Sequence, residues 1–481
     1  MFKRFLTILL CCIMLAACLC ACDENSQMLG SAPNEPVIDV NVTTVPAVAP
    51  TDPDDDSNEN MSDVNGDSDG DGSEIDGAVI EPGSINLSDF DTNVIIKTKG
   101  EYTLSGVLSG IVYVKTEGDV VLKLNGVTIS NNDGPCIYVE NAEMIAIHLV
   151  GGTVNTLSTN GNVSYTDVDA AIYSQVNTRF GGNGTIKIEN RVGRGVNVKG
   201  SLVIDDGAYV INSENDCINV KKDFAINRGV FSLVSNQDEG LQSDKKLIIN
   251  NGEFNINAVG DAVRAKVLLE INGGVFDIIT ENEGLESKGE MVINGGALTI
   301  NAVDDGINAI ESLVINGGEI YVLSSTNDAI DSNGPLEING GFIYAVGLTA
   351  PEGAIDADVK RLSVNGGTVI GVGAINTQQH EGEQNVIVIN PLTEAMVEKI
   401  EIKNEGNEIV FECKILPYSI RPDMFVGTKF DRASFMTASF LLTSPNFSDG
   451  TYLVYVNGEL IDIIVVSSNW SVAGNDNNIK F

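Results

Sequence analysis

Six acidic residues recur along the middle of the chain, each two positions before an apolar residue of a short predicted strand. If the repeats stack as parallel strands, neighbouring carboxylates lie about 4.8 Å apart and repel by roughly 3 to 4 kcal/mol near a protein surface. A hard cation held by oxygen atoms offsets such repulsion, and Ca²⁺ takes about six to eight oxygen ligands. We call these six residues the acidic column: Asp216, Glu239, Asp261, Glu283, Asp305 and Asp328.

Further carboxylates flank the acidic column on both sides. Some stand directly before a column position, and others stand one position after the apolar residue. We expect the column and its flanks to bind Ca²⁺ together. The alternative is that these side chains extend into water and form a solvated edge. The flanking residues are Asp238, Asp304, Glu286, Asp331 and Asp356.

Basic side chains line up beside this acidity. Lys221, Lys266 and Lys288 each stand three positions after the apolar residue, and Arg264 takes the outward position of its strand. Next to Ca²⁺, Arg264 and the lysines would contact uronic acid carboxylates, or one lysine would remove the C5 proton of a uronate in a lyase reaction. The simpler alternative is that they only balance the nearby acids.

Two tyrosines complete the predicted carbohydrate surface. Tyr321 and Tyr344 occupy matching outward strand positions in adjacent repeats. Outward aromatic rings stack on sugar rings, but aromatic ladders also stabilise β-solenoids by themselves. The predicted carbohydrate-binding set is therefore Arg264, Lys266, Lys288, Tyr321 and Tyr344.

A tetrad of the type Ile-Asn-Gly-Gly predicts the elements that position these residues. Its successive copies are separated by 22, 23, 22, 22, 22, 23 and 26 residues, beginning at Ile204. A fixed period of this length indicates a solenoid, and the alternation of apolar and polar residues after each Gly pair indicates strands. We expect an all-β fold: a right-handed parallel β-helix over residues 85–375, with coils of about 22 residues. A β-rich C-terminal cap follows over residues 376–481. Trp470 belongs either to this cap or to a binding surface.

One position per repeat accepts only Gly, Ala or Cys. It lies directly before the apolar residue of the short strand and includes Cys136 and Cys217. We interpret it as a tight bend. The two cysteines are about three coils apart, roughly 14 Å at the strand spacing, which is beyond disulfide reach, so we expect free, buried thiols.

The N-terminus predicts the compartment. Residues 1–17 have two basic residues followed by an apolar run that ends Leu15-Ala16-Ala17-Cys18, the pattern of a lipoprotein signal peptide cleaved before a lipid-modified Cys18. Residues 18–84 are acidic, with sixteen Asp and Glu from Asp23 to Ser84, and read as a disordered linker. We expect a protein held on the extracellular face of the cell membrane by its lipid alone.

The net charge of −39 limits the classes of molecule that the protein can bind. It argues against direct binding to nucleic acid or to an anionic membrane surface, and it favours cations or ligands bridged by cations.

Four ordered motifs stand along the chain: Gly100 to Gly106, Leu124 to Ile129, Asp304 to Ala309 and Ser444 to Tyr452. Together they resemble the clostridial carbohydrate-binding domain family. The resemblance implies a β-helix similar to the family 9 pectate lyases, with bound calcium and calcium-dependent binding of plant cell-wall polysaccharide, namely cellulose or polygalacturonate. Lyase activity is not an established family trait. The chain departs from the usual Asp-Gly turn at Asp216-Cys217 and Asp261-Ala262.

These observations leave three hypotheses for function. The first is a surface lipoprotein that binds plant polysaccharide, pectin or cellulose, in a calcium-dependent manner. The second is a calcium-dependent polysaccharide lyase of the same fold, with Lys221, Lys266 or Lys288 as the base. The third is an adhesin in which calcium serves only to rigidify the solenoid.

Overall fold

The computed structural model describes residues 75–159, 168–348, 352–357, 362–375, 381–390, 397–414, 438–467 and 469–474. The predicted signal peptide, the predicted lipidation site Cys18 and most of the predicted linker lie outside these residues. No helix in the part of the chain described here is long and apolar enough to cross a membrane.

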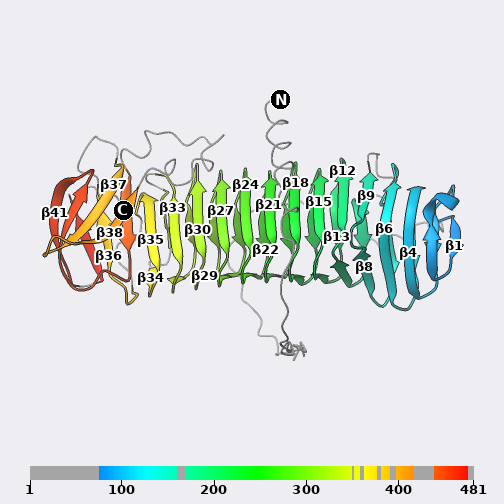
Figure 1. Ribbon diagram of the computed structural model, residues 1–481, viewed down its shortest axis with the longest axis horizontal. Coiled ribbons are helices and arrows are strands. Elements are labelled where there is room, and N and C mark those ends of the chain that lie inside the picture. Colours follow the sequence, from blue (N-terminus) through cyan, green and yellow to red (C-terminus); the bar gives the residue numbers. More distant parts are fainter. Residues whose placement is uncertain are drawn as a thin grey trace, which may run out of the picture. The chain divides into compact units, whose positions relative to one another are not determined.

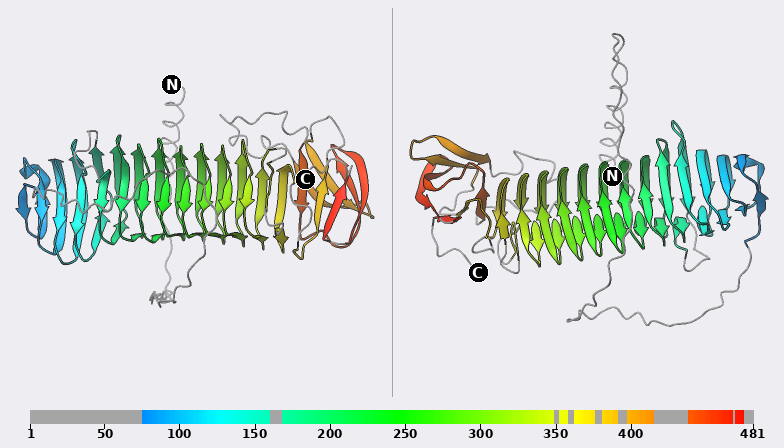
Figure 2. Two further views of the ribbon diagram at one scale, coloured as in Figure 1. Left: turned by 180° about the vertical axis from the view of Figure 1, so that it is seen from behind. Right: turned by 90° about the horizontal axis from the view of Figure 1, so that it is seen from below.

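A parallel β-solenoid forms most of the described chain, and its coils stack side by side in one row (Figures 1 and 2). One stack of strands is a twelve-stranded parallel sheet, which we call sheet A. Its strands are β1 (Ala78–Ile80), β3 (Val94–Ile96), β5 (Val112–Lys115), β7 (Ile137–Asn141), β10 (Ala170–Ser174), β13 (Arg194–Val198), β16 (Ile218–Val220), β19 (Leu241–Ser243), β22 (Val263–Ala265), β25 (Leu285–Ser287), β28 (Ile307–Ala309) and β31 (Ile330–Ser332).

Each later coil adds a second strand that belongs to the tetrad. These strands also pair in parallel with the equivalent strand of the next coil, as Leu202 does with Phe224. They are β8 (Ile145–Leu149), β11 (Thr178–Gly182), β14 (Leu202–Ile204), β17 (Phe224–Ile226), β20 (Lys246–Ile249), β23 (Leu268–Ile271), β26 (Glu290–Ile293), β29 (Ser312–Ile315), β32 (Leu336–Ile338) and β34 (Leu362–Val364).

A longer third strand follows the Gly pair. The chain turns into this strand through a residue with positive φ, such as Gly274 at 110°. This residue is glycine because residues with a side chain rarely adopt that conformation. The third strands are β9 (Val154–Thr159), β12 (Thr185–Asn190), β15 (Ala208–Ser213), β18 (Val230–Ser235), β21 (Glu253–Ala258), β24 (Val275–Thr280), β27 (Ala297–Ala302), β30 (Glu319–Ser324), β33 (Phe342–Val346) and β35 (Thr368–Gly373).

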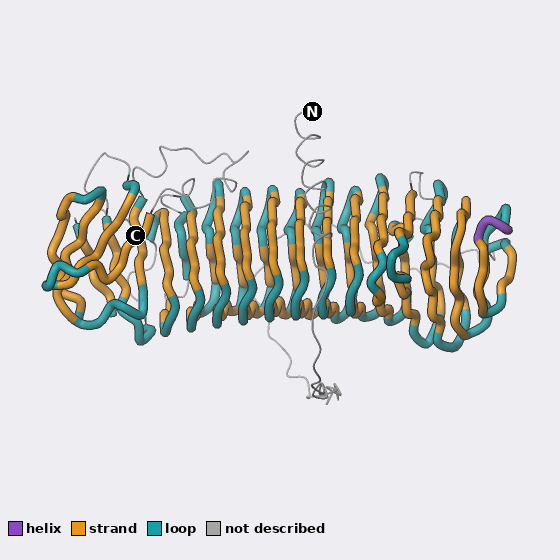
Figure 3. Tube along the Cα trace, in the orientation of Figure 1, coloured by secondary structure: helices purple, strands orange, loops and turns teal. Residues whose placement is uncertain are grey.

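The first coils differ from the rest. Here β2 (Gly83–Asn86), β4 (Gly100–Ser109) and β6 (Val120–Ser130) take the place of the separate second and third strands, and β6 pairs with both β8 and β9. The short 3-10 helix η1 (Leu87–Asp89) lies at this end of the row (Figure 3). Because β1 precedes residue 85 and β2 begins at Gly83, the solenoid begins several residues before its predicted start.

The solenoid interior is apolar and close-packed. Parallel rings of Tyr209, Phe231, Phe254 and Phe276 stack with centroid separations of 4.9, 4.7 and 4.5 Å, one ring per coil. The small-residue position is a tight bend as predicted, since a Cβ added to Gly284 would lie 2.4 Å from the carbonyl oxygen of Gly306. Cys136 and Cys217 are free and buried, as expected from the sequence.

The C-terminal cap is a second layer packed on the last coils (Figure 1, red end). Three of its strands continue the solenoid sheet: β39 (Ser439–Thr443) pairs antiparallel with β35, and β36 (Val386–Ile389) joins β39 to β42 (Trp470–Ala473). A four-stranded sheet contains β38 (Ile409–Lys414), β37 (Lys399–Asn404), β40 (Gly450–Val456) and β41 (Glu459–Val466) in that order. Trp470 packs against the solenoid core and is therefore part of the cap.

The cap buries one tyrosine of the predicted carbohydrate-binding set. Tyr344 is only 2% exposed because the outer face of β33 packs against the four-stranded sheet, and Tyr321 is partly buried beside it. The sequence prediction that Tyr344 faces solvent was wrong. The alternation correctly placed its side chain outside the solenoid, but another layer of the same chain covers it.

Candidate functional site

The acidic column lies where each coil turns into sheet A, and most of it is buried. Asp216, Asp261, Asp305 and Asp328 are 0%, 2%, 6% and 5% exposed, whereas Glu283 is half-buried. The alternative of a solvated edge therefore does not describe these side chains. Burying several carboxylates side by side is costly unless each finds a hydrogen bond, a counter-ion or a proton.

Backbone amides satisfy one oxygen of several column aspartates. Asp216 Oδ1 accepts from the amide of Glu239 at 3.3 Å, Asp261 Oδ1 from that of Glu283 at 3.3 Å, and Asp305 Oδ1 from that of Asp328 at 3.0 Å. Each donor belongs to the following coil. These aspartates thus join consecutive coils as well as bearing charge.

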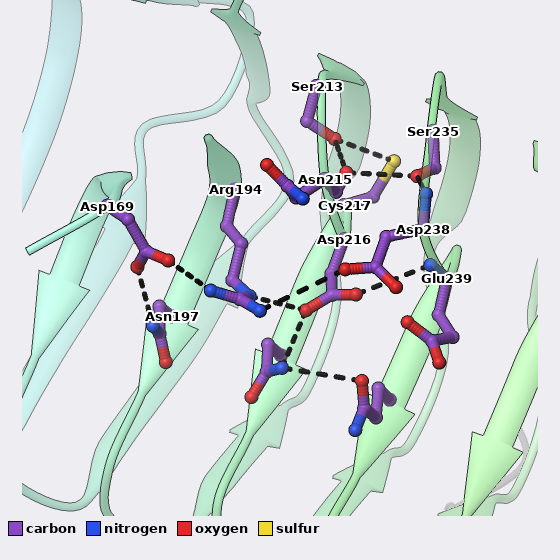
Figure 4. Close-up of polar contacts among 12 residues, drawn as sticks. Asp169, Arg194, Asn197, Ser213, Asn215, Asp216, Cys217, Ser235, Asp238 and Glu239 are labelled. Atoms are coloured by element: carbon purple, nitrogen blue, oxygen red, sulfur yellow. Dashed lines mark hydrogen bonds and ion pairs between the residues drawn. The ribbon is translucent and has the colours of Figure 1, made fainter. Parts of the chain in front are cut away.

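The first part of the column is neutralised by two arginines. Arg194 donates to Asp216 Oδ2 through Nε at 2.5 Å, pairs with Asp169, and has Asp238 Oδ2 at 3.9 Å from Nη2 (Figure 4). We call the column from Asp216 to Glu283, with its flanking residues, the N-terminal segment.

Arg264 lies among the next carboxylates. Its Nη1 donates to Glu239 Oε1 at 2.6 Å, and its Nε lies 2.8 Å from Glu286 Oε2 and 3.6 Å from Asp261 Oδ2. The Nε contact with Glu286 is a charge contact without hydrogen-bond geometry. The outward arginine expected to bind carbohydrate is thus already engaged by three carboxylates of its own chain.

A proton balances part of the remaining charge in this segment. Burial, together with hydrogen bonds to Asp238 and Asp216, raises the pKa of Glu239 to about 9. The pKa of Asp238 is lowered, chiefly because its side chain hydrogen-bonds Glu239. Glu239 is therefore protonated at neutral pH and donates to an ionised Asp238.

The rest of the column is neutralised differently. We call Asp304, Asp305, Asp328, Asp331 and Asp356 the C-terminal segment. Within the described ranges, no lysine or arginine pairs with Asp305 or Asp328. Burial and the neighbouring carboxylates instead raise the pKa of Asp305 to about 7 and that of Asp328 to about 9.

Three groups of carboxylates have oxygen atoms within 4.8 Å of one another. Two belong to the N-terminal segment and include contacts with Arg194 or Arg264. The third belongs to the C-terminal segment. Asp304 and Asp305 belong to none of these groups. The groups are Asp216, Asp238 and Glu239; Asp261, Glu283 and Glu286; and Asp328, Asp331 and Asp356.

A buried amide next to the third group favours a cation. Asn308 lies in register between Glu286 and Asp331 on sheet A, is 8% exposed, and has no hydrogen-bond partner for Oδ1. An unpartnered buried oxygen beside grouped carboxylates gives an all-oxygen donor set. Such a set fits Ca²⁺.

The predicted lysines are all ion-paired. Lys221 Nζ lies 2.9 Å and Lys266 Nζ 3.1 Å from the carboxylate of Asp244, and Lys288 pairs with Glu286. This matches the simpler alternative of charge balance. No lysine among them is aimed at the C-terminal segment, as a base beside a metal there would be.

Four residues of this surface were missed in the sequence, although each follows the repeat. Arg194 occupies the acidic-column position one coil before Asp216, and Asp169 occupies the flanking position one coil before that. Asp244 stands in the column of the lysines, and Asn308 in the column of Arg264 and Asp331. Extending the columns by one or two coils would have found Arg194 and Asp169, and following every position within the columns would have found Asp244 and Asn308.

Comparison with known proteins places the chain in a family. A family model described as carbohydrate-binding domain-containing protein matches residues 90–321 and 279–406. A carbohydrate-binding domain-containing protein of Acetivibrio thermocellus is 29% identical over 135 residues, which cover 26% of this chain and 47% of that protein. The alignment thus spans about half the length of this relative.

A solved structure is also similar. It is a polysaccharide lyase-like protein from C. thermocellum, a gadolinium derivative, at 22% identity and a TM-score of 0.32, covering 52% of this chain and 84% of that one. The two family matches together extend over residues 90–406, well over half of the 481 residues. The chain belongs to the family of carbohydrate-binding domain-containing proteins.

Proposed function

We propose that this protein binds an acidic plant cell-wall polysaccharide of the pectin type, and that Ca²⁺ held by the C-terminal segment is required. The observation that carries the proposal is the pair Asp305 and Asp328, which are buried, have no basic partner among the described residues, and lie beside the unpartnered Oδ1 of Asn308. Asp328, Asp331 and Asp356, whose oxygen atoms lie within 4.8 Å of one another, would hold the ion together with Asn308. Bound there, Ca²⁺ would link these carboxylates to those of a uronic acid polymer.

The charge of the chain supports a cation-bridged ligand. With a net charge of −39, the protein as a whole repels a polyuronate. A bound cation reverses this repulsion locally. The lysines on the same side of sheet A would contribute further attraction.

The experiment is a sedimentation assay of the full chain with insoluble polygalacturonate and with cellulose. We expect binding to polygalacturonate in Ca²⁺, its loss in chelator, and its loss in the double variant Asp305→Asn, Asp328→Asn. Asp238→Asn is the matched control, because Asp238 lies in the N-terminal segment. Binding that persists both in chelator and in the double variant would contradict the proposal.

Absorbance of unsaturated uronate is recorded in the same tubes. We expect none, since Lys221, Lys266 and Lys288 are engaged in ion pairs. Rising absorbance would make the protein a lyase. Failure of every polysaccharide to bind would favour the adhesin.

We also propose that Cys18 anchors the protein to the outer face of the membrane. The support is the residue pattern of positions 1–18. A Cys18→Ser variant should lose its lipid and partition into the aqueous phase of a detergent extraction. Retention of this variant in the detergent phase would contradict a lipid anchor at Cys18.

A further inference from the structure

A row of charged residues runs parallel to the acidic column. Each stands at the third position after the apolar residue of its coil, and the sheet A strands before them pair in register. Successive members are therefore one coil apart, about 4.8 Å. We call this set the lysine row: Lys199, Lys221, Asp244, Lys266 and Lys288.

Asp244 is the acidic member of this row, and it is held from both sides. Lys221 Nζ lies 2.9 Å from its Oδ2, and Lys266 Nζ lies 3.1 Å from its Oδ1. Gln242 Nε2 donates to Oδ1 at 3.3 Å. Burial opposes ionisation, but the hydrogen bonds from the two lysines lower the pKa of Asp244, so it carries a full negative charge at neutral pH.

The effect on the row is local. Asp244 engages two lysines at once, each with one carboxylate oxygen, so the centre of the row presents little net positive charge. The lysine side chains remain accessible, with Lys221 36% and Lys266 46% exposed, while Asp244 is 21% exposed. A carboxylate arriving from solvent can reach both ammonium groups but must compete with the one already there.

We propose that Asp244 takes the place of a ligand carboxylate between Lys221 and Lys266 and thereby limits the affinity of this surface for acidic polysaccharide. This inference rests on the proposed function, because it names a residue that determines specificity for the same class of ligand. The lysines of the lysine row contact successive carboxylates of the polymer. Asp244, at the centre of the row, interrupts these contacts.

The test is Asp244→Asn, which removes the charge and keeps the size of the side chain. We expect the Kd for soluble polygalacturonate to fall at least about fivefold and its salt dependence to steepen, because two lysines become available. Affinity for cellulose should stay unchanged. Asp277→Asn is the matched control: it removes the same charge from an exposed position on β24, in a different sheet of the solenoid.

Amine acetylation followed by mass spectrometry supplies a second readout. In Asp244→Asn, polygalacturonate should protect Lys221 and Lys266 from the reagent, whereas in the wild type it should protect them less. Thermal melting checks that both variants fold. If Asp244→Asn melts at the same temperature as the wild type, the variant is folded. An affinity for polygalacturonate no higher than that of the wild type then overturns the inference.

The outcomes separate this inference from the proposed function. If the wild type binds polygalacturonate and Asp244→Asn binds no better, or if Asp277→Asn gains as much, the inference is overturned and the proposed function stands. If the wild type binds only cellulose and Asp244→Asn gains no polygalacturonate binding, the inference fails while carbohydrate binding survives. If neither protein binds any polysaccharide, both fail.

Discussion

The N-terminal and C-terminal segments of the acidic column occupy the same position in successive coils, yet they neutralise their carboxylates differently. In the first, Arg194 and Arg264 contact the carboxylates directly. In the second, Asp305 and Asp328 have backbone amides as hydrogen-bond donors and no basic side chain among the described residues. The same repeat position is therefore neutralised by arginines of the chain in the first segment, whereas in the second we propose that a bound cation does so.

The energetic difference between the segments follows from this pairing. A buried carboxylate beside an arginine has its charge offset within the chain, at the cost of removing both groups from water. A buried carboxylate beside other carboxylates must instead hold a proton or bind a cation. We therefore expect the first segment to be insensitive to Ca²⁺ and the second to depend on it.

Removal of Arg264 should have the largest effect on stability. Arg264→Gln leaves Asp261 and Glu286 without their shared counter-ion and Glu239 without a hydrogen-bond donor. We therefore expect the free energy of unfolding to fall by about 2 to 4 kcal/mol. Chemical denaturation measures this change. The control is Arg191→Gln, whose side chain is 70% exposed and whose loss should cost less than about 1 kcal/mol. Equal losses in the two variants would show that Arg264 is an ordinary surface cation.

The proton on Glu239 should make stability depend on pH. Its pKa is about 9 in the folded protein and 4.5 in the unfolded chain, so between these values unfolding releases a proton. The free energy of unfolding therefore falls as pH rises, by at most about 1.4 kcal/mol per pH unit for one proton. Glu239→Gln should flatten the decline between about pH 7 and 9. Denaturation at several pH values in chelator tests this. If the slope of unfolding free energy against pH is unchanged in Glu239→Gln, Glu239 does not hold the proton.

Transplanting an arginine should convert the second segment into the first. Asn308 stands in the column of Arg264, so Asn308→Arg would place a guanidinium beside Asp305 and Asp328. We expect the calcium-free protein to gain about 1 kcal/mol in unfolding free energy, and the stabilisation by Ca²⁺ to disappear. Thermal melts with and without Ca²⁺ measure both effects. Retention of the full calcium response in this variant would mean that the ion binds elsewhere.

Local periodicity in the sequence predicted the solenoid, the tight bend at Cys136 and Cys217, and the acidic column, because each depends on equivalent positions in neighbouring coils. Long-range packing was not predictable in the same way. Nothing near Tyr344 indicates that the four-stranded sheet covers it, since that sheet lies in a later part of the chain. The pairing of Arg194 with Asp169 and Asp216 was missed because the columns were not followed into the earlier coils.

Calcium titration calorimetry of the wild type, Asp328→Asn and Asp238→Asn tests the contrast between the segments most directly. We predict that the wild type and Asp238→Asn bind Ca²⁺, and that a hundredfold excess over Kd stabilises each of them by about 2.7 kcal/mol, whereas Asp328→Asn binds none. Loss of binding in Asp238→Asn with retention in Asp328→Asn would contradict this assignment, as would a wild-type protein that binds no Ca²⁺.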